Sequence, residues 1–136
     1  MTDRLEPAAR RRLMQAVRSK DTAPEIAVRS LLHGMGYRFR LHRKDLPGTP
    51  DIVLPGRRAA IFVHGCFWHG HGCRIGQLPK SRLDYWLPKI EANRERDRRK
   101  GGALEAAGWR VLTVWQCEIR DLDVLQERLW IFLGAR

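Results

Sequence analysis

Cysteines, acidic side chains and long hydrophobic runs are all scarce in this chain of 136 residues. Three cysteines are an odd number, which argues against a closed disulfide framework and fits a reducing compartment. The longest apolar runs, 59–63 and 129–133, fall far short of the ~18 residues that a membrane span needs. No apolar stretch follows the arginines near the N-terminus, which excludes a secretory signal. These absences predict a cytoplasmic protein, nucleoid-associated if bacterial, with no membrane contact.

The charge is strongly one-sided. There are 26 Lys and Arg residues against 15 Asp and Glu, a formal net charge of +11. Such an excess indicates a polyanionic partner, usually nucleic acid. An apolar content of 43% with five tryptophans argues against intrinsic disorder. No repeat or Gly/Ser linker divides the chain, so we expect one domain, residues 1–136, whose basic helical segment 1–20 contacts DNA.

Helical spacing of apolar residues predicts several helices. We place them at residues 5–17, from 22 to 34 or 36, at 81–100, at 103–107 and at 122–133. In the second, Thr22 and Glu25 match a capping box. Its expected buried face consists of Ile26, Leu31, Leu32 and Met35. Pro88 should kink the long charged helix or mark the first turn of a separate one.

Alternating patterns predict strands between these helices. Tyr37, Phe39 and Leu41 alternate with Arg38, Arg40 and His42, as in a half-buried strand with a basic outer face. Residues 51–54 and 59–64 read as a hairpin, 65–76 as a glycine-rich loop and 109–115 as a further strand. The fold class is therefore α/β, with a mixed central β-sheet flanked by helices.

Three cysteines and one histidine have the composition of a structural zinc site. Cys66, His71 and Cys73 lie in the glycine-rich loop, and Cys117 directly follows the last strand. A complete Cys3His set leaves no open coordination position, so zinc there would be structural and not catalytic. The alternative is that the cysteines bind no metal and are two loop thiols and one core thiol. In that case nothing in the sequence would hold the irregular loop in place.

Several residues suggest phosphodiester chemistry, each with an ordinary structural alternative. Asp51 at the head of a strand resembles the first half of a nuclease metal pattern, but Phe62 and His64 stand where its second half belongs. A histidine of this region can act as a general base oriented by Asp97. Taken alone, Asp51 reads as a turn residue and Asp97 as part of a solvated helix face.

Aromatic residues in a strongly basic protein suggest contact with bases. Phe67 and Trp68 lie between the predicted zinc ligands, and Trp86 lies near the start of the charged helix. Such rings can wedge between base pairs or stack on bases. Trp86 fits a core position equally well.

The combined motifs resemble the very-short-patch repair (Vsr) endonucleases. Residues 61–73 read IFVHGCFWHGHGC, preceded by LPGTPD at 46–51 and followed by ERDRR at 95–99. The resemblance extends from Met14 and DTAPE at 21–25 to WRVLTVWQC at 109–117. It implies a restriction-endonuclease-like core and a magnesium-dependent enzyme that nicks one DNA strand 5′ to the thymine of a T·G mismatch. Such mismatches arise when 5-methylcytosine deaminates.

The resemblance also implies a role for each matching residue. Asp51 would bind magnesium together with the backbone carbonyl of Val63, a position where the best-known member has threonine. His69 would be the general base with Asp97 behind it, while Glu25 and His64 would hold the water shell of the metals. Zinc would be held by Cys66, His71, Cys73 and Cys117. DNA would be contacted by Met14, Phe67, Trp68, Trp86, Lys89 and Asn93.

Partners and competing functions follow from the same comparison. The resemblance implies a monomer acting on mismatched double-stranded DNA, beside a cytosine methyltransferase and with mismatch-repair factors as possible partners. A non-catalytic zinc-containing DNA-binding module is one alternative, but it has no need of Asp51 facing a His–Asp pair. A restriction nuclease of the same fold is another, which wedging aromatic residues do not favour.

Overall fold

The computed structural model describes residues 22–74, 76–77 and 81–134. In chain order the elements are α2 (Ala23–Gly34), β1 (Arg40–Leu41), β2 (Ile52–Leu54), the short 3-10 helix η1 (Pro55–Arg57), β3 (Ala59–His64), α3 (Leu83–Ala106), β4 (Arg110–Trp115), the 3-10 helix η2 (Gln116–Arg120) and α4 (Leu122–Leu133). The helix expected at 5–17 and the basic segment 1–20 lie outside the described residues. No helix in the described part of the chain is long and apolar enough to cross a membrane.

One mixed sheet organises the fold, with its strands in the order β1-β2-β3-β4. β2 and β3 pair antiparallel, with Ile52 opposite Ile61, which confirms the expected hairpin. β4 then pairs parallel to β3 after the chain has crossed over through α3. Because parallel partners end at the same edge, the segments that follow His64 and Trp115 start next to each other.

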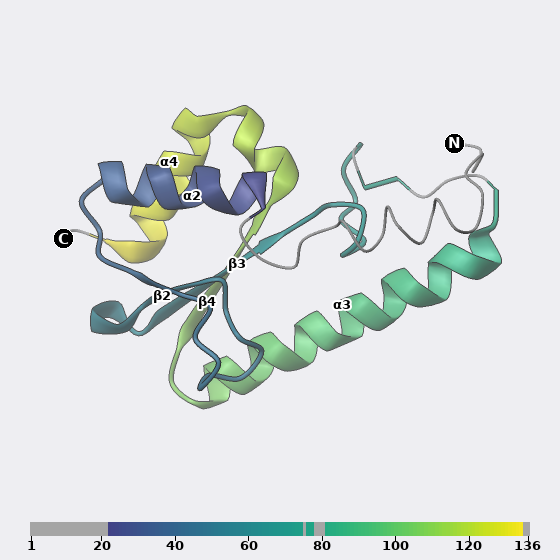
Figure 1. The fold of residues 1–136 in the computed structure, drawn as a ribbon, viewed down its shortest axis with the longest axis horizontal. Helices are drawn as coiled ribbons and strands as arrows, with labels where there is room; N and C mark the ends of the chain where they lie inside the picture. The colour runs from purple at the N-terminus through teal and green to yellow at the C-terminus, as the bar shows by residue number, and fades with distance from the viewer. Residues whose placement is uncertain (1–21, 75, 78–80, 135–136) are drawn as a thin grey trace.

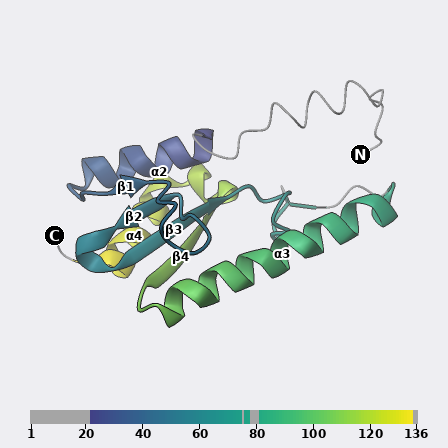
Figure 2. The same cartoon turned by 60° about the horizontal axis from the view of Figure 1, so that its bottom comes forward.

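The helices cover the two faces of this sheet unequally. Figures 1 and 2 both show α2 and α4 together on one face and α3 on the other. Side chains of β3 alternate between the faces: Ile61 packs with α2 and α4, whereas Phe62 packs with Leu104 of α3. The same alternation gives His64 the parity of Phe62, toward α3.

The final helix and the first described helix start where their sequences indicate. α4 has the expected bounds; Asp121 caps it by accepting a hydrogen bond from the Val124 N–H at 3.2 Å. At α2, the Thr22 side chain accepts from the Glu25 N–H at 3.4 Å. Both caps satisfy N–H groups that a helix start leaves unpaired.

The buried face of α2 matches the expectation at Leu31, Leu32 and Met35 and differs at Ile26. Leu32 is fully buried, and Leu31 and Met35 pack against the core. Ile26 is 47% exposed, and Glu25 and Val28 are buried in its place. Glu25, Val28 and Leu32 are spaced three and four apart, so they share the helix face that meets the sheet. Glu25, expected to complete the capping box, turns its carboxylate to Arg29 and His42 instead. The apolar pattern therefore missed one edge of the face, because a buried carboxylate lies there and Ile26 does not.

The long charged helix continues through both of its expected breaks. α3 includes Pro88 beyond its first turn, and the short helix expected at 103–107 is its final part. Pro88 costs a hydrogen bond near the N-terminus, where few are made. Gly101 and Gly102 stay helical because Leu104, fully buried against Ala60 and Phe62, fixes the C-terminal end.

The strand expected at 37–42 is shorter than its alternating pattern. Only Arg40 and Leu41 pair with β2, and Leu41, expected to be buried, is exposed. Tyr37 is buried through a different contact, since its hydroxyl donates to the Gly134 carbonyl at 2.5 Å. His42 has a left-handed φ of 47° and leaves the predicted outer face. An edge strand with one partner cannot enforce alternation over six residues.

Candidate functional site

The site begins where β3 and β4 end together. The glycine-rich loop follows β3, and η2 follows β4, so Cys66 and Cys117 meet although 51 positions separate them in the chain. The Cys117 N–H donates to Cys66 Sγ at 3.3 Å. The parallel strand pair thus places the two ends of the predicted zinc set together.

All four residues of that set converge. The ligand atoms of Cys66, His71, Cys73 and Cys117 lie within 4.8 Å of one another. Cys117 Sγ and His71 Nδ1 are 3.6 Å apart. A tetrahedral ion with bonds of about 2.3 Å keeps its sulfur ligands about 3.8 Å apart, and thiolate with imidazole is the donor set of structural zinc. The cluster can therefore hold a metal ion, and its donors fit zinc.

The three thiols differ in acidity. Burial raises the pKa of Cys66 to about 12, and it also raises the pKa of Cys117. For Cys73, desolvation acts in the same direction but hydrogen bonding with His71 and Gly76 outweighs it, lowering its pKa to about 6. Metal binding at this cluster must therefore release protons chiefly from Cys66 and Cys117.

A second cluster pairs two histidines with one carboxylate. His69 Nδ1 lies 2.7 Å from Asp97 Oδ2, a hydrogen bond in which the carboxylate accepts. The rings of His64 and His69 stack with centroids 3.8 Å apart and an interplanar angle of 3°. The bond to Asp97 fixes the His69 tautomer with its proton on Nδ1, leaving the Nε2 lone pair to accept another proton.

His64 remains uncharged beside this pair. Burial, together with the neighbouring His69, lowers the pKa of His64 to about 4. Its Nδ1 lies 3.8 Å from Asp97 Oδ2 and has no hydrogen-bond partner within the described residues. A buried polar atom without a partner carries a desolvation cost, which a bound water or ligand would remove.

Asp51 lies beside Val63 and belongs to a third cluster, which also contains Glu25 and His42. Its Oδ2 accepts a hydrogen bond from the Val63 N–H at 2.8 Å, so its carboxylate lies next to the residue expected to share its metal ion. Burial raises the pKa of Asp51, although the Val63 N–H opposes the shift. The ligand atoms of Glu25, His42 and Asp51 lie within 4.8 Å of one another. Carboxylate oxygens held close together are typical ligands of a divalent cation.

A cavity of about 830 Å³ joins the second and third clusters. Its wall includes Asp51, Val63 and the His69–Asp97 pair. Two cations, Lys44 and Lys100, also line it. Carboxylates for a metal, an imidazole for a proton and ammonium groups for an anion thus face one space. This arrangement can neutralise a phosphodiester and deprotonate a water.

The aromatic residues gather beside the cavity. Phe67, Trp68 and Trp86 form a cluster of edge-on rings with centroids 5.1, 5.2 and 6.0 Å apart. Trp86 is only 8% exposed, whereas Phe67 and Trp68 are half-buried on the loop. Asn93 holds that loop by donating its amide to the Trp68 carbonyl at 2.7 Å. Lys89 lies over the ring of Tyr85 at 5.0 Å.

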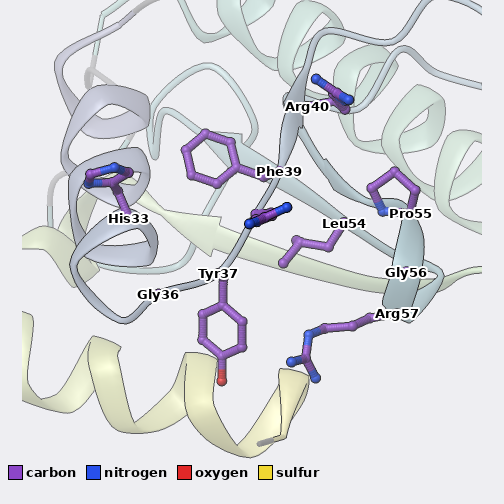
Figure 3. A pocket seen from close by; sticks show the side chains of 10 residues that line it. His33, Gly36, Tyr37, Phe39, Arg40, Leu54, Pro55, Gly56 and Arg57 are labelled. Carbon is purple, nitrogen blue, oxygen red and sulfur yellow. The ribbon is translucent and has the colours of Figure 1, made fainter. Parts of the chain in front are cut away.

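A larger hollow elsewhere lies at a packing interface between structural elements. It has about 960 Å³ and is lined by the strand edge around Phe39 and Arg40 together with η1. Figure 3 shows Tyr37 and Arg57 reaching toward the C-terminal end of α4. Arg57 donates to the Leu133 carbonyl at 2.8 Å, and Tyr37 to that of Gly134. Among the described residues no carboxylate lines this hollow, so His33 there has no acidic partner with which to hold a metal ion.

The sequence analysis did not identify one histidine of the cavity. The alternating pattern places His42 on the outer face of a strand, but in the structure its ring contacts Glu25 of α2 and lines the cavity. Only the approach of α2 to the sheet brings His42 there, and no local pattern records that approach. Met14, expected to contact DNA, lies outside the described residues.

Comparison with known proteins adds to this geometry. The family model described as DNA mismatch endonuclease Vsr matches residues 2–75. The type II nicking enzyme V.XorIIP of Xanthomonas oryzae pv. oryzae is 77% identical over 129 residues, 95% of each chain. The DNA mismatch endonuclease Vsr of Escherichia coli K12 is 45% identical over 127 residues, 93% of this chain and 81% of that protein.

Among solved structures, the catalytic domain of the homing endonuclease I-Bth0305I matches with a TM-score of 0.57. The alignment covers 85% of this chain and 100% of that domain at 23% identity. This likeness shows a shared fold.

Proposed function

The chain belongs to the Vsr family of DNA mismatch endonucleases, and from this premise we propose that it nicks one DNA strand 5′ to the thymine of a T·G mismatch in a magnesium-dependent reaction. It is a DNA endonuclease with the expected restriction-endonuclease-like α/β fold. The mismatch, the strand and the metal are the proposed parts. The natural substrate is then the product of 5-methylcytosine deamination, which links the protein to a cytosine methyltransferase.

One observation carries the proposal: Asp51 and the His69–Asp97 pair line the same cavity. Hydrolysis of a phosphodiester needs charge neutralisation at the phosphate and a deprotonated water. Asp51 and the imidazole of His69 are the side chains suited to these two tasks. A protein that only binds DNA requires neither.

The proposal assigns a task to six residues of the cavity. Asp51 and the Val63 carbonyl are the proposed holders of the magnesium ion, which when bound supplies charge neutralisation and an acidified water. His69 accepts the proton of the attacking water at Nε2, while Asp97 orients its ring through Nδ1. Glu25 and His64 hold waters around the ion. The neutral state of His64 suits it to accept or donate a hydrogen bond.

Mismatch recognition is assigned to the aromatic loop and the start of α3. Phe67 and Trp68 extend from a loop whose proposed zinc ligands flank them on both sides. Trp86 packs against both rings, so its insertion into a base step requires this cluster to open. Lys89 and Asn93 contact the mismatched bases. A weakened T·G pair lowers the cost of opening a step, which is a few kcal/mol.

Zinc in the Cys66–His71–Cys73–Cys117 cluster is proposed as a structural support for that loop. Since a nick in one strand needs only one active site, we propose that the protein acts as a monomer. Mismatch-repair factors are the proposed protein partners. Acting on chromosomal DNA places it at the bacterial nucleoid.

A strand-resolved nicking assay tests the proposal. Otherwise identical duplexes carry T·G, U·G or C·G at one position, each strand labelled separately, with magnesium or with EDTA. We expect one nick 5′ to the thymine of T·G, only with magnesium, and no cleavage of C·G. Asp51→Asn should abolish the nick but keep mismatch binding. Cleavage of both strands of C·G would favour a restriction nuclease.

A further inference from the structure

His42 faces the carboxylates of the cavity without an assigned role. Its Nε2 lies 3.1 Å from Glu25 Oε1 and 3.0 Å from Glu25 Oε2. Together with Asp51, these residues place one nitrogen and two carboxylate oxygens within 4.8 Å of one another. The cluster lines the cavity and includes the proposed magnesium ligand.

The backbone holds His42 in this place at some conformational cost. It follows the edge strand β1 with a φ of 47°, a region that residues other than glycine rarely adopt. Its N–H donates to the Asp51 carbonyl at 3.1 Å, which continues the β1–β2 pairing by one residue. The left-handed turn and this hydrogen bond bring the ring to the Asp51 side chain. Strained positions are often kept where they place a functional group.

The spacing fits a six-coordinate ion. Neighbouring ligands at about 2.1 Å from such an ion lie about 3.0 Å apart. The separation between His42 Nε2 and Glu25 Oε1, 3.1 Å, is close to this value. Arg29 contacts Glu25 Oε2, so Oε1 is the oxygen that an ion would take. Glu25 is only 1% exposed and Asp51 is half-buried, so their charges gain from a cation held between them.

A nitrogen donor changes which ion such a site prefers. Carboxylates and carbonyls alone suit Mg²⁺, whereas imidazole favours first-row transition metals. We propose that His42 is a direct metal ligand at a position in the cavity that binds Mn²⁺ in preference to Mg²⁺. At this position Glu25 contacts the ion directly, and not through the water shell assigned to it above, and Asp51 is the third ligand. This inference rests on the proposed function, because it treats the cavity as the nuclease centre. Metal binding by His42, Glu25 and Asp51 can nevertheless be measured without measuring nicking.

Binding of Mn²⁺ to the full zinc-loaded chain tests the assignment without a nicking measurement. Electron spin echo modulation of bound Mn²⁺ detects the ¹⁴N of a coordinated imidazole, and Mg²⁺ competition gives the preference. We expect an imidazole coupling and Mn²⁺ affinity at least about tenfold above that for Mg²⁺. In His42→Gln, which keeps an amide donor for Glu25, the coupling should disappear and the preference should fall by about tenfold.

Two further variants make the result specific. His42→Asn tolerates the left-handed φ better than glutamine does, so it repeats the test if His42→Gln fails to fold. His33→Gln removes an exposed histidine outside the cavity and should leave coupling and affinity unchanged. The inference would be overturned if Mn²⁺ bound to the wild-type protein showed no nitrogen coupling. It would also be overturned if the coupling persisted in both His42 variants.

The outcomes separate this inference from the proposed function. Nicking of T·G duplexes without nitrogen coupling would leave the nuclease proposal standing and remove His42 as a ligand. Coupling that depends on His42, in a protein that nicks none of the duplexes with either metal, would keep the metal site and refute the proposed reaction.

Discussion

Replacement of Asp97 by asparagine gives a direct test of the proposed catalytic pair, His69 and Asp97. Asp97 accepts the His69 Nδ1 proton at 2.7 Å and is only 19% exposed. Asparagine has the same shape but can donate its amide N–H to Nδ1. The ring would then keep its proton on Nε2, where the proposed reaction needs a lone pair. The substitution thus changes the tautomer while preserving the packing.

The size of the effect follows from two losses. The His69 ring becomes charged during the proposed reaction, and a hydrogen bond to a charged group contributes about 1.5–3 kcal/mol. The loss of this hydrogen bond is by itself expected to slow the reaction roughly 10- to 150-fold. The wrong tautomer adds to this, so we expect nicking to slow by about 10²–10⁴-fold, the range for a general base. Binding of mismatched DNA should be unchanged or tighter, because a negative charge near the phosphate is removed.

Single-turnover nicking of a labelled T·G duplex, resolved on a denaturing gel, measures the rate, and fluorescence anisotropy in EDTA measures binding. Glu95→Gln is the matched control: it makes the same chemical change on the same helix, at an exposed residue paired only with Arg98 in the described structure. Its rate should stay within a factor of about two, as expected for an exposed ion pair. A comparable rate for Asp97→Asn would refute the assignment of His69 as the base.

Three further predictions concern metal, core and pH. Cys117→Ala should release zinc, measured by atomic absorption, and lower the melting temperature; full zinc retention would contradict the Cys3His assignment. Leu129→Ala removes a fully buried side chain and should lower the free energy of unfolding by about 2–5 kcal/mol in urea titrations, whereas Ile131→Ala on the same helix, 74% exposed, should cost under about 0.5 kcal/mol. The pKa of His64 is about 4 when folded against 6.5 ordinarily, so stability should fall as pH drops from about 6.5 to 4, by up to roughly 3 kcal/mol. Unfolding of wild type and His64→Gln across this range measures the difference; equal pH slopes would contradict it.

Strongly periodic segments of the fold could be predicted from the sequence. The 122–133 helix and the 51–64 hairpin have patterns long or regular enough to determine their structure locally. Pro88 and the Gly101–Gly102 pair misled the helix prediction, because tertiary contacts of Leu104 outweigh local propensity. Exposed Ile26 and buried Glu25 show the same limit: hydrophobic spacing does not anticipate a carboxylate that faces a cavity.

The candidate site divides in a similar way. The four zinc-type ligands could be identified by composition, because all cysteines of the chain belong to one set. Asp51 and Asp97 could be given roles only through family resemblance, since each has an ordinary structural explanation. His42 could not be found, because its place depends on a left-handed turn and on the contact between α2 and the β1 edge.

The parallel pairing of β3 with β4 also sets an order of assembly. The whole of α3 lies between these strands in the chain. Pairing of β3 with β4 therefore carries the entropy cost of closing a long loop, and we expect it to form late in folding. The cysteine cluster needs residues from both sides of this closure, and the His69–Asp97 pair needs α3 docked on the sheet. A nascent chain that has emerged only as far as β3 therefore has neither the complete cysteine cluster nor the proposed catalytic pair. If these groups act as proposed, the chain gains endonuclease activity only after α3 and the last strand have been made.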